Sequence, residues 1–146
     1  MLLDANILRN LIDIKGKIMT GQVGDTVIQH QHKASGHCGA VELLLTLPNG
    51  LVDPHRCDCS ICRRKAAAVA TVPLQNLKLV KGEDVLTLYQ FDSKEAKHYF
   101  CSVCGIYTHH QRRSNPNEYS INIGCLEGGQ PDTTNRSSGL RWHQSS

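Results

Sequence analysis

The spacing of the cysteines constrains this chain more than any other feature of its sequence. Three thiols lie within six positions as Cys57, Cys59 and Cys62, and the pair Cys101 and Cys104 follows further along the chain. The chain has seven cysteines, and an odd number fits a disulfide framework poorly. In a chain without an export signal, such close spacing indicates metal or redox chemistry in a reducing cytosol.

The pair Cys101 and Cys104 is followed by Gly105 and lies between two strand-like runs, residues 97–100 and 106–110. Zinc prefers tetrahedral thiolate or imidazole ligands, and two thiols on one short loop suit that geometry. A glycine after them lets the backbone fold back, so that its amides can approach the sulfur atoms. A C-x-x-C pair also occurs as a redox motif, but no βαβ pattern surrounds this one. We therefore predict a zinc knuckle here.

The triplet Cys57, Cys59 and Cys62 offers a different kind of metal site. Three thiolates leave the fourth position of a zinc ion for water or an incoming ligand, as in catalytic zinc sites. Alternatively, His55 supplies a fourth protein ligand and the site only holds loops together. The spacing does not choose between these two hypotheses. A thiol-rich shell also suits an exogenous thiolate ligand.

Composition excludes several functional classes. The chain has 146 residues, 40% hydrophobic and 20% charged, as expected for one globular domain. Its net charge of +3, without a long basic extension, argues against a nucleic-acid partner. No apolar run approaches the ~20 residues of a membrane helix. Polar residues interrupt the N-terminal segment, so no secretory signal is recognised and a cytoplasmic location is expected.

The pattern of apolar residues predicts a mainly β protein with short hairpins. Residues 1–19 have near-helical spacing and predict an N-terminal helix, within a leader that spans residues 1–33. A zinc-binding domain is expected over residues 34–128, followed by a polar C-terminal tail over residues 129–146 that is partly disordered. Strand-like runs in the domain cover residues 40–47, 51–55, 66–72, 77–80, 85–91, 97–100, 106–110 and 119–123.

Two turn signals in this pattern predict hairpins. Pro48-Asn49-Gly50 separates the first two runs, and residues 81–84 separate the runs at 77–80 and 85–91. Each turn would then join two strands that pair with one another.

Four motifs in a fixed order resemble one known family. The chain is similar to the glutathione-dependent formaldehyde-activating enzymes, a family that also includes centromere protein V, over residues 34–128. The resemblance implies an Mss4-like zinc-binding β fold, one structural zinc, one catalytic zinc and an activity that joins glutathione to formaldehyde. The motifs are Gly36-His37-Cys38-Gly39-Ala40-Val41, Cys57-Asp58-Cys59-Ser60-Ile61-Cys62-Arg63-Arg64, Phe100-Cys101-Ser102-Val103-Cys104-Gly105 and Asn122-Ile123-Gly124-Cys125-Leu126.

The resemblance also implies roles for individual cysteines. By position, the catalytic zinc ligands correspond to Cys57, Cys59 and Cys62, and three of the structural zinc ligands correspond to Cys38, Cys101 and Cys104.

One position departs from the family pattern. Gly36 stands where the fourth structural thiol belongs, and a glycine has no side chain to bind metal. His37 is adjacent, but in an extended chain its side chain points away from the face used by Cys38. His30, His32 or water are the remaining candidates, and a site that lacks one protein ligand is expected to bind metal less tightly.

These residues suggest a function. The leading hypothesis is a zinc-dependent carbon–sulfur lyase that forms or breaks S-(hydroxymethyl)glutathione, with Arg63 and Arg64 binding a substrate carboxylate. Arg112 and Arg113 are weaker candidates for that role. Histidines 98, 109 and 110 are more simply explained as strand residues, and Cys125 as a buried thiol. The alternatives are a zinc-stabilised binding module without catalysis, or an enzyme that acts on another thiol or small carbonyl compound.

Overall fold

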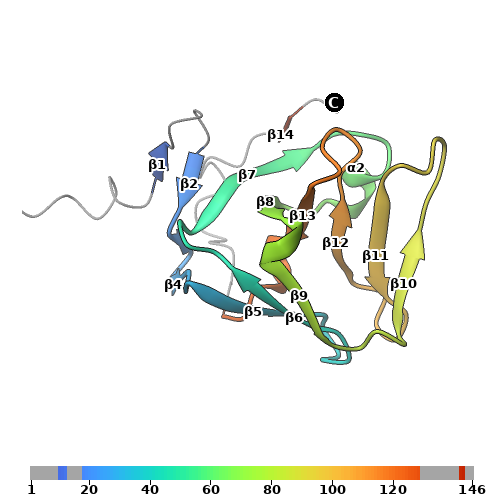
Figure 1. Cartoon of the computed structure of the whole chain (residues 1–146), viewed down its shortest axis with the longest axis horizontal. Helices are drawn as coiled ribbons and strands as arrows, with labels where there is room; N and C mark the ends of the chain where they lie inside the picture. Colours follow the sequence, from blue (N-terminus) through green and yellow to red (C-terminus); the bar gives the residue numbers. More distant parts are fainter. Residues whose placement is uncertain (1–9, 13–17, 129–141, 144–146) are drawn as a thin grey trace, which may run out of the picture.

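The computed structural model describes residues 10–12, 18–128 and 142–143, which form two β-sheets, a small β-hairpin and short helices (Figure 1). The larger sheet has the strand order β1-β2-β7-β8-β13-β12-β11-β10, with β14 parallel to β7 and the other neighbours antiparallel. Its strands are β1 (Asn10–Ile12), β2 (Ile18–Thr20), β7 (Leu51–Cys57), β8 (Val69–Pro73), β10 (Leu86–Tyr89), β11 (Lys97–Cys101), β12 (Tyr107–Gln111), β13 (Glu118–Asn122) and β14 (Trp142–His143).

The smaller sheet has the strand order β5-β6-β9, and all its pairs are antiparallel. The mainly β fold predicted from the sequence is confirmed. The remaining elements are short: β5 (Gln31–Ser35), β6 (Glu42–Thr46) and β9 (Leu77–Lys81) in this sheet, β3 (Gln22–Val23) and β4 (Thr26–Val27) in the hairpin, the helix α2 (Cys62–Lys65) and the 3₁₀ turns η1 (Leu74–Asn76) and η2 (Ile123–Cys125).

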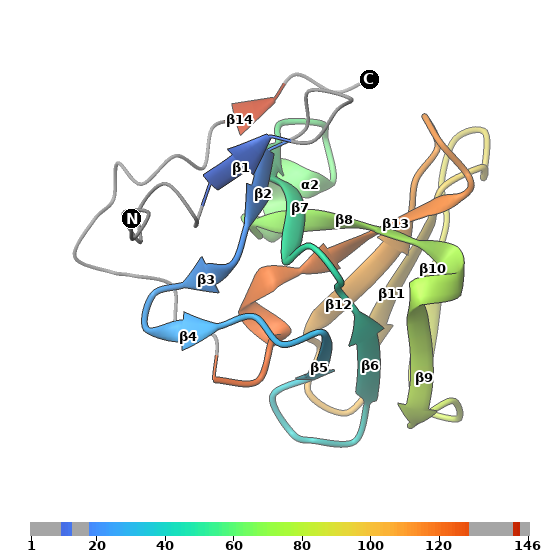
Figure 2. The ribbon, with the colours of Figure 1, turned by 60° about the vertical axis from the view of Figure 1, so that its left-hand side comes forward.

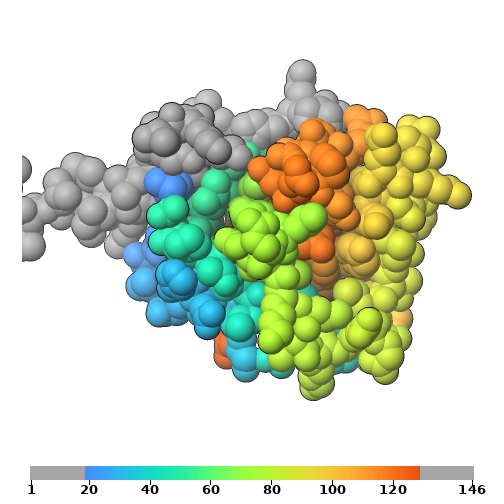
Figure 3. Space-filling view, in the orientation of Figure 1, coloured from blue at the N-terminus to red at the C-terminus, as the bar shows by residue number. Residues whose placement is uncertain are grey.

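The hydrophobic core draws on both sheets. Strand β6 alternates between half-buried and buried residues, and its buried Leu43 and Leu45 point into the core. Ala70 and Val72 of β8 and Ile121 of β13 enter the same cluster from the larger sheet. The ribbon turned by 60° shows β6 and β9 lying against the larger sheet (Figure 2). In the space-filling view the atoms of the β9 region, in green, lie directly beside atoms of the larger sheet, in orange and yellow (Figure 3).

Both predicted hairpins are wrong, because each turn carries the chain from one sheet to the other and does not join two paired strands. Strands β6 and β7 flank residues 48–50 but belong to different sheets, as do β9 and β10 around residues 81–84. Gly50 has φ +74° and Gly82 has φ +96°, a backbone region that favours glycine. The turn residues were therefore recognised correctly, but a turn signal does not specify which sheet its second strand joins.

The N-terminal segment also differs from the prediction. Residues 10–12 and 18–19, expected in a helix, lie in strands β1 and β2, and β2 pairs with β7. Short apolar runs are compatible with either a helix or a strand. Here the segment forms strands, because β2 pairs with the edge of the sheet at β7. Ile28 packs into the core, and β5 spans the expected boundary at residue 34, which stays a prediction.

The rest of the predicted helix, and the tail from residue 129 apart from β14, lie outside the described residues. In the described part of the chain, no helix is both long enough and apolar enough to cross a membrane.

The larger sheet has a second, polar face. Cross-strand pairing aligns His98 of β11 with His110 of β12, His110 with Ser120 of β13, and Ser120 with Thr71 of β8. Because side chains directly opposite one another project from the same face, these four form a row across the sheet. Ile121 and Ala70, one residue away, face the core instead. The polar row is the floor on which the site described next is built.

Candidate functional site

The predicted cysteine triplet is gathered into one cluster, here called the first cluster. Cys57 ends strand β7, Cys62 begins helix α2, and Cys59 lies in the loop between them. The Cys62 amide donates to the Cys59 sulfur at 3.4 Å. All three sulfur atoms lie within 4.8 Å of one another. The sulfurs are therefore close enough to share one metal ion.

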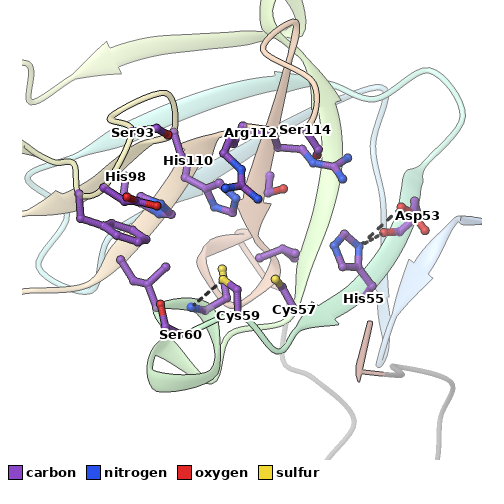
Figure 4. A pocket seen from close by; sticks show the side chains of 18 residues that line it. Asp53, His55, Cys57, Cys59, Ser60, Ser93, His98, His110, Arg112 and Ser114 are labelled. Carbon is purple, nitrogen blue, oxygen red and sulfur yellow. Dashed lines mark hydrogen bonds and ion pairs between the residues drawn. The ribbon is translucent and has the colours of Figure 1, made fainter. Parts of the chain in front are cut away.

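His55 is not part of the first cluster. A bulge in the pairing of β7 with β8 falls between Val52 and His55, and Asp53 within it has φ 52°. The His55 Nδ1 donates to the Asp53 carbonyl oxygen at 2.6 Å, and the ring turns toward Asp53 (Figure 4). Among the described residues, the group that can hold a metal here contains three cysteines and leaves out this histidine.

The environment affects the three thiols differently. Burial raises the pKa of Cys62 well above its usual value and also raises that of Cys57. Burial acts in the same direction on Cys59, but hydrogen bonds, first among them that of the Cys62 amide, outweigh it and lower its pKa. Cys59 is thus the thiol most easily ionised, and ionising all three requires a cation beside them.

A cavity of about 470 Å³ opens beside the first cluster. It lies within the size range of small-molecule sites, roughly 300–1,000 Å³. All three cysteines line it, together with His55, His98 and His110, the apolar side chains of Ile61, Val69 and Phe91, and the arginines Arg112 and Arg113. Figure 4 shows His98, His110 and Arg112 across the cavity from Cys59, whereas His55 lies on the side of Cys57.

Lys65, which directly follows Arg63 and Arg64 in the sequence, is a further contributor to the site. It ends helix α2, and its Nζ donates to the Nδ1 of His98 at 2.7 Å. The same Nζ lies 3.6 Å from the centroid of the Tyr107 ring, a cation–π contact. Burial lowers the pKa of Lys65 to about 8, while the nearby cysteines oppose that shift. A cation thus lies near the cysteines of the first cluster.

Two histidines of the cavity, His98 and His110, are held neutral. Burial, followed by the charge of Lys65, lowers the pKa of His98 to about 4. The same two causes, in the same order, lower the pKa of His110 to about 2. Each nitrogen of a neutral imidazole has one defined role, as donor or acceptor. Only their position in adjacent strands, which a sequence alone does not pair, brings these histidines to the cysteines.

The structure places the predicted arginines in two different environments. Arg63 and Arg64 are exposed on helix α2, and the Arg64 Nη1 donates to the Ser60 carbonyl oxygen at 2.6 Å. Arg112 lines the cavity and its Nη1 pairs with Glu118 at 3.0 Å, while Arg113 lines the cavity and is exposed. The role assigned to Arg63 and Arg64 stays a prediction, and Arg113, a weaker candidate in the sequence, gains support from its place in the cavity.

A second cluster consists of Cys38, Cys101 and Cys104. Its sulfur atoms also lie within 4.8 Å of one another, with 3.6 Å between those of Cys38 and Cys101. Gly105 has φ +77° and its amide donates to the Cys101 carbonyl oxygen at 2.7 Å, which closes the predicted tight turn. Amide hydrogen bonds from Cys38 and Ile106 lower the pKa of Cys104 to about 6.

Gly36 lies directly against the second cluster. A Cβ atom built on it would lie 3.6 Å from the Cys104 sulfur and 3.6 Å from the Cys101 Cβ. His32 is not available to replace a thiol there, because its Nδ1 accepts from the Gln29 amide and its Nε2 donates to the Glu127 carbonyl. In the described part of the chain, neither His30 nor His37 belongs to the metal-competent group.

The chain was compared with known families and structures. The family model described as glutathione-dependent formaldehyde-activating enzyme matches residues 31–142. The crystal structure of a Rhodobacter sphaeroides protein is similar, with 52% sequence identity and a TM-score of 0.70, over 76% of this chain and 99% of that one. This chain therefore belongs to the glutathione-dependent formaldehyde-activating enzyme family.

Proposed function

We propose that this protein is a zinc-dependent carbon–sulfur lyase that joins glutathione and formaldehyde to S-(hydroxymethyl)glutathione. One observation carries the proposal: three cysteine sulfurs converge beside a cavity of about 470 Å³, and His55 does not close their cluster. Three protein ligands and one open position are typical of catalytic metal sites. The family to which the chain belongs supports the same chemistry.

The donor set of the first cluster fits zinc. Three thiolates form a soft ligand shell, which favours zinc over the hard cations magnesium and calcium. Cys57, Cys59 and Cys62 would hold the ion, and Lys65 offsets part of their combined negative charge. When bound, zinc supplies a Lewis acid that favours the ionised form of a thiol. Unoxidised thiols at both clusters suit a cytoplasmic location.

The cavity offers features that match the substrates. Glutathione carries carboxylates, and Arg112 and Arg113 line the cavity, with Arg63 and Arg64 on the adjacent helix α2. Ile61, Val69 and Phe91 add apolar side chains to the lining of the cavity.

The chemistry is an addition. The thiolate sulfur attacks the carbonyl carbon of formaldehyde, and a carbon–sulfur bond forms while the π electrons move to the oxygen. That oxygen then takes one proton from water. The thiol released one proton to solvent when it ionised, so no net proton is gained or lost. The reverse sequence is the lyase direction.

The test is the rate of adduct exchange between formaldehyde and glutathione, measured by NMR with protein of known zinc content. Wild type should accelerate the exchange, and Cys59→Ser should not. Cys125→Ser is a matched control, because Cys125 is buried and belongs to neither metal-competent cluster. No acceleration by folded, zinc-loaded wild type would contradict the formaldehyde assignment. The search would then turn to other thiols or to a binding module without catalysis.

A further inference from the structure

His98 lies at the centre of a stack of rings inside the cavity. Its ring lies 5.8 Å from Phe91 and 4.7 Å from His110, centroid to centroid, with interplanar angles of 30° and 27°. The residue is 4% exposed. It is paired across strands with His110, and both line the cavity beside the first cluster (Figure 4). The stacking on both faces fixes the plane of the ring, so only its edges are left for hydrogen bonds.

Lys65 determines which nitrogen of His98 carries the proton. An ammonium group has donors only, so the 2.7 Å contact requires the Nδ1 of His98 to accept. In a neutral imidazole the proton then resides on Nε2. The neutral form dominates at physiological pH, because burial lowers the pKa of His98 to about 4. Lys65 is itself held by its contact with the face of Tyr107.

The Nε2 of His98 is available to a ligand. Within the part of the chain that the structure describes, the hydrogen bond of this ring is the one at Nδ1. A fully buried nitrogen without a hydrogen bond would be unsatisfied, and among the described residues the Nε2 of His98 is not such an atom. Nε2 is therefore not fully buried. Because the residue lines the cavity, Nε2 is accessible from the cavity, and His98 offers one oriented N–H to a molecule bound there.

We propose that His98 is a catalytic hydrogen-bond donor to the carbonyl oxygen of the aldehyde, and that Lys65 is the positioning residue that fixes its tautomer. This inference rests on the proposed function. As the sulfur–carbon bond forms, the carbonyl π electrons become a negative charge on oxygen, and a preoriented donor stabilises that charge as it develops. His98 keeps its proton throughout, and the oxygen is protonated by water.

The first test examines the tautomer and needs no substrate. Long-range ¹H–¹⁵N spectra of the wild type should show His98 neutral and protonated at Nε2. Lys65→Met removes the donor and should yield a mixture of tautomers, whereas Lys65→Arg retains a donor and should restore the Nε2–H form. A ring protonated at Nδ1, or a charged ring near neutral pH, would overturn the inference whatever reaction the protein catalyses.

The second test separates catalysis from binding. His98→Phe keeps a stacked ring without the donor, and kcat should fall about 10²–10³-fold with KM for glutathione nearly unchanged. His98→Gln retains an N–H and should recover part of the rate. His109→Gln is the matched control, since His109 is equally buried but does not line the cavity.

Two outcomes would overturn the role of His98. A rise in KM for glutathione at unchanged kcat would show that the donor serves a substrate carboxylate instead. Wild-type kinetics in His98→Phe would remove His98 from the reaction while leaving the proposed function intact. If the wild type itself does not accelerate the reaction, the proposed function fails as well, whatever the tautomer.

Discussion

At the scale of single residues, Gly36 determines how the second cluster can hold a metal. Three thiols converge there, and the position from which a fourth would come carries no side chain. The backbone at Gly36 is not in the left-handed region, and its neighbours leave room for a Cβ at ordinary contact distance. The second cluster therefore offers three thiols and has space beside them for a fourth.

Gly36→Cys should complete a four-thiolate site. We expect zinc affinity at the second cluster to rise on the order of 10-fold or more, because a fourth protein thiolate joins ligands already in place. Competition with a chromophoric chelator measures this directly. Gly21→Cys is the control, since a Cβ at Gly21 meets nothing within 4 Å. Equal affinities in the two variants would contradict the assignment of Gly36 to the metal site.

Arg113 should contribute to glutathione binding. It is exposed and lines the cavity, so its guanidinium is free to pair with a substrate carboxylate. Arg113→Gln should raise KM for glutathione several-fold, with little change in kcat. This rise corresponds to a loss of about 1 kcal/mol of binding free energy. Arg63→Gln is measured beside it. A larger effect at Arg63 would favour the assignment made from the sequence over the one favoured by the cavity.

The residues of the site were predictable to different degrees. Spacing alone groups Cys57 with Cys59 and Cys62, because a short loop forces neighbouring thiols together. It does not reveal that Lys65 turns inward while Arg63 and Arg64 stay exposed, because three consecutive basic residues read alike in a sequence. Which of the three side chains is buried depends on how the short helix α2 is oriented against the sheet.

At the scale of elements, the turn at residues 48–50 connects two sheets and depends on Gly50. A side chain at this position would strike the backbone of Thr20, and φ is +74°. The turn thus lies tightly against β2, the strand that pairs with the start of β7.

Gly50→Ala should destabilise the protein. Both the positive φ and the collision with the Thr20 carbonyl act against any Cβ, and we expect a loss of roughly 1–3 kcal/mol in the free energy of unfolding. Urea denaturation measures the change, with Gly21→Ala as the control at an open position. A stability equal to that of Gly21→Ala would mean that the turn relaxes without cost.

Strands were more predictable than their partners. The runs at 97–100 and 106–110 were expected to flank a tight turn, and β11 and β12 do so. Alternation identified β13, because one of its faces is apolar and the other polar. Pairing between β8 and β13 joins segments far apart in the chain, and local patterns carry no information about such contacts.

At the scale of the whole molecule, the second cluster connects the two sheets. Cys38 lies in the turn between β5 and β6 of the smaller sheet, whereas Cys101 ends β11 of the larger sheet and Cys104 lies in the turn between β11 and β12. A metal ion shared by these thiols would hold the sheets together across the core.

Buried histidines should make the metal-free protein sensitive to acid. Burial lowers the pKa of His98 and His109 to about 4 and that of His110 to about 2, whereas an unfolded chain titrates near 6.5. Below pH 6.5 the unfolded chain therefore binds protons that the folded one does not. The free energy of unfolding should be highest above that pH and should fall toward pH 4, with a loss on the order of 2 kcal/mol per histidine at pH 5.

Urea denaturation of metal-free protein at pH 7 and pH 5 checks this loss. His109→Gln removes one titrating group outside the cavity, so its loss between the two pH values should be smaller than that of wild type. Identical losses in the two proteins would show that other groups govern the acid response.

The turns at residues 48–50 and 81–84 are two of the passages of the chain between the sheets, and they have a consequence for how the molecule is assembled. Strand β6 pairs with β9, but β7 and β8, which separate them in sequence, belong to the other sheet. The smaller sheet is therefore completed only after a long loop has closed around strands of the larger one. Such closure carries an entropic cost before its contacts form, which slows folding. No single cut at either passage yields two fragments that each contain a whole sheet.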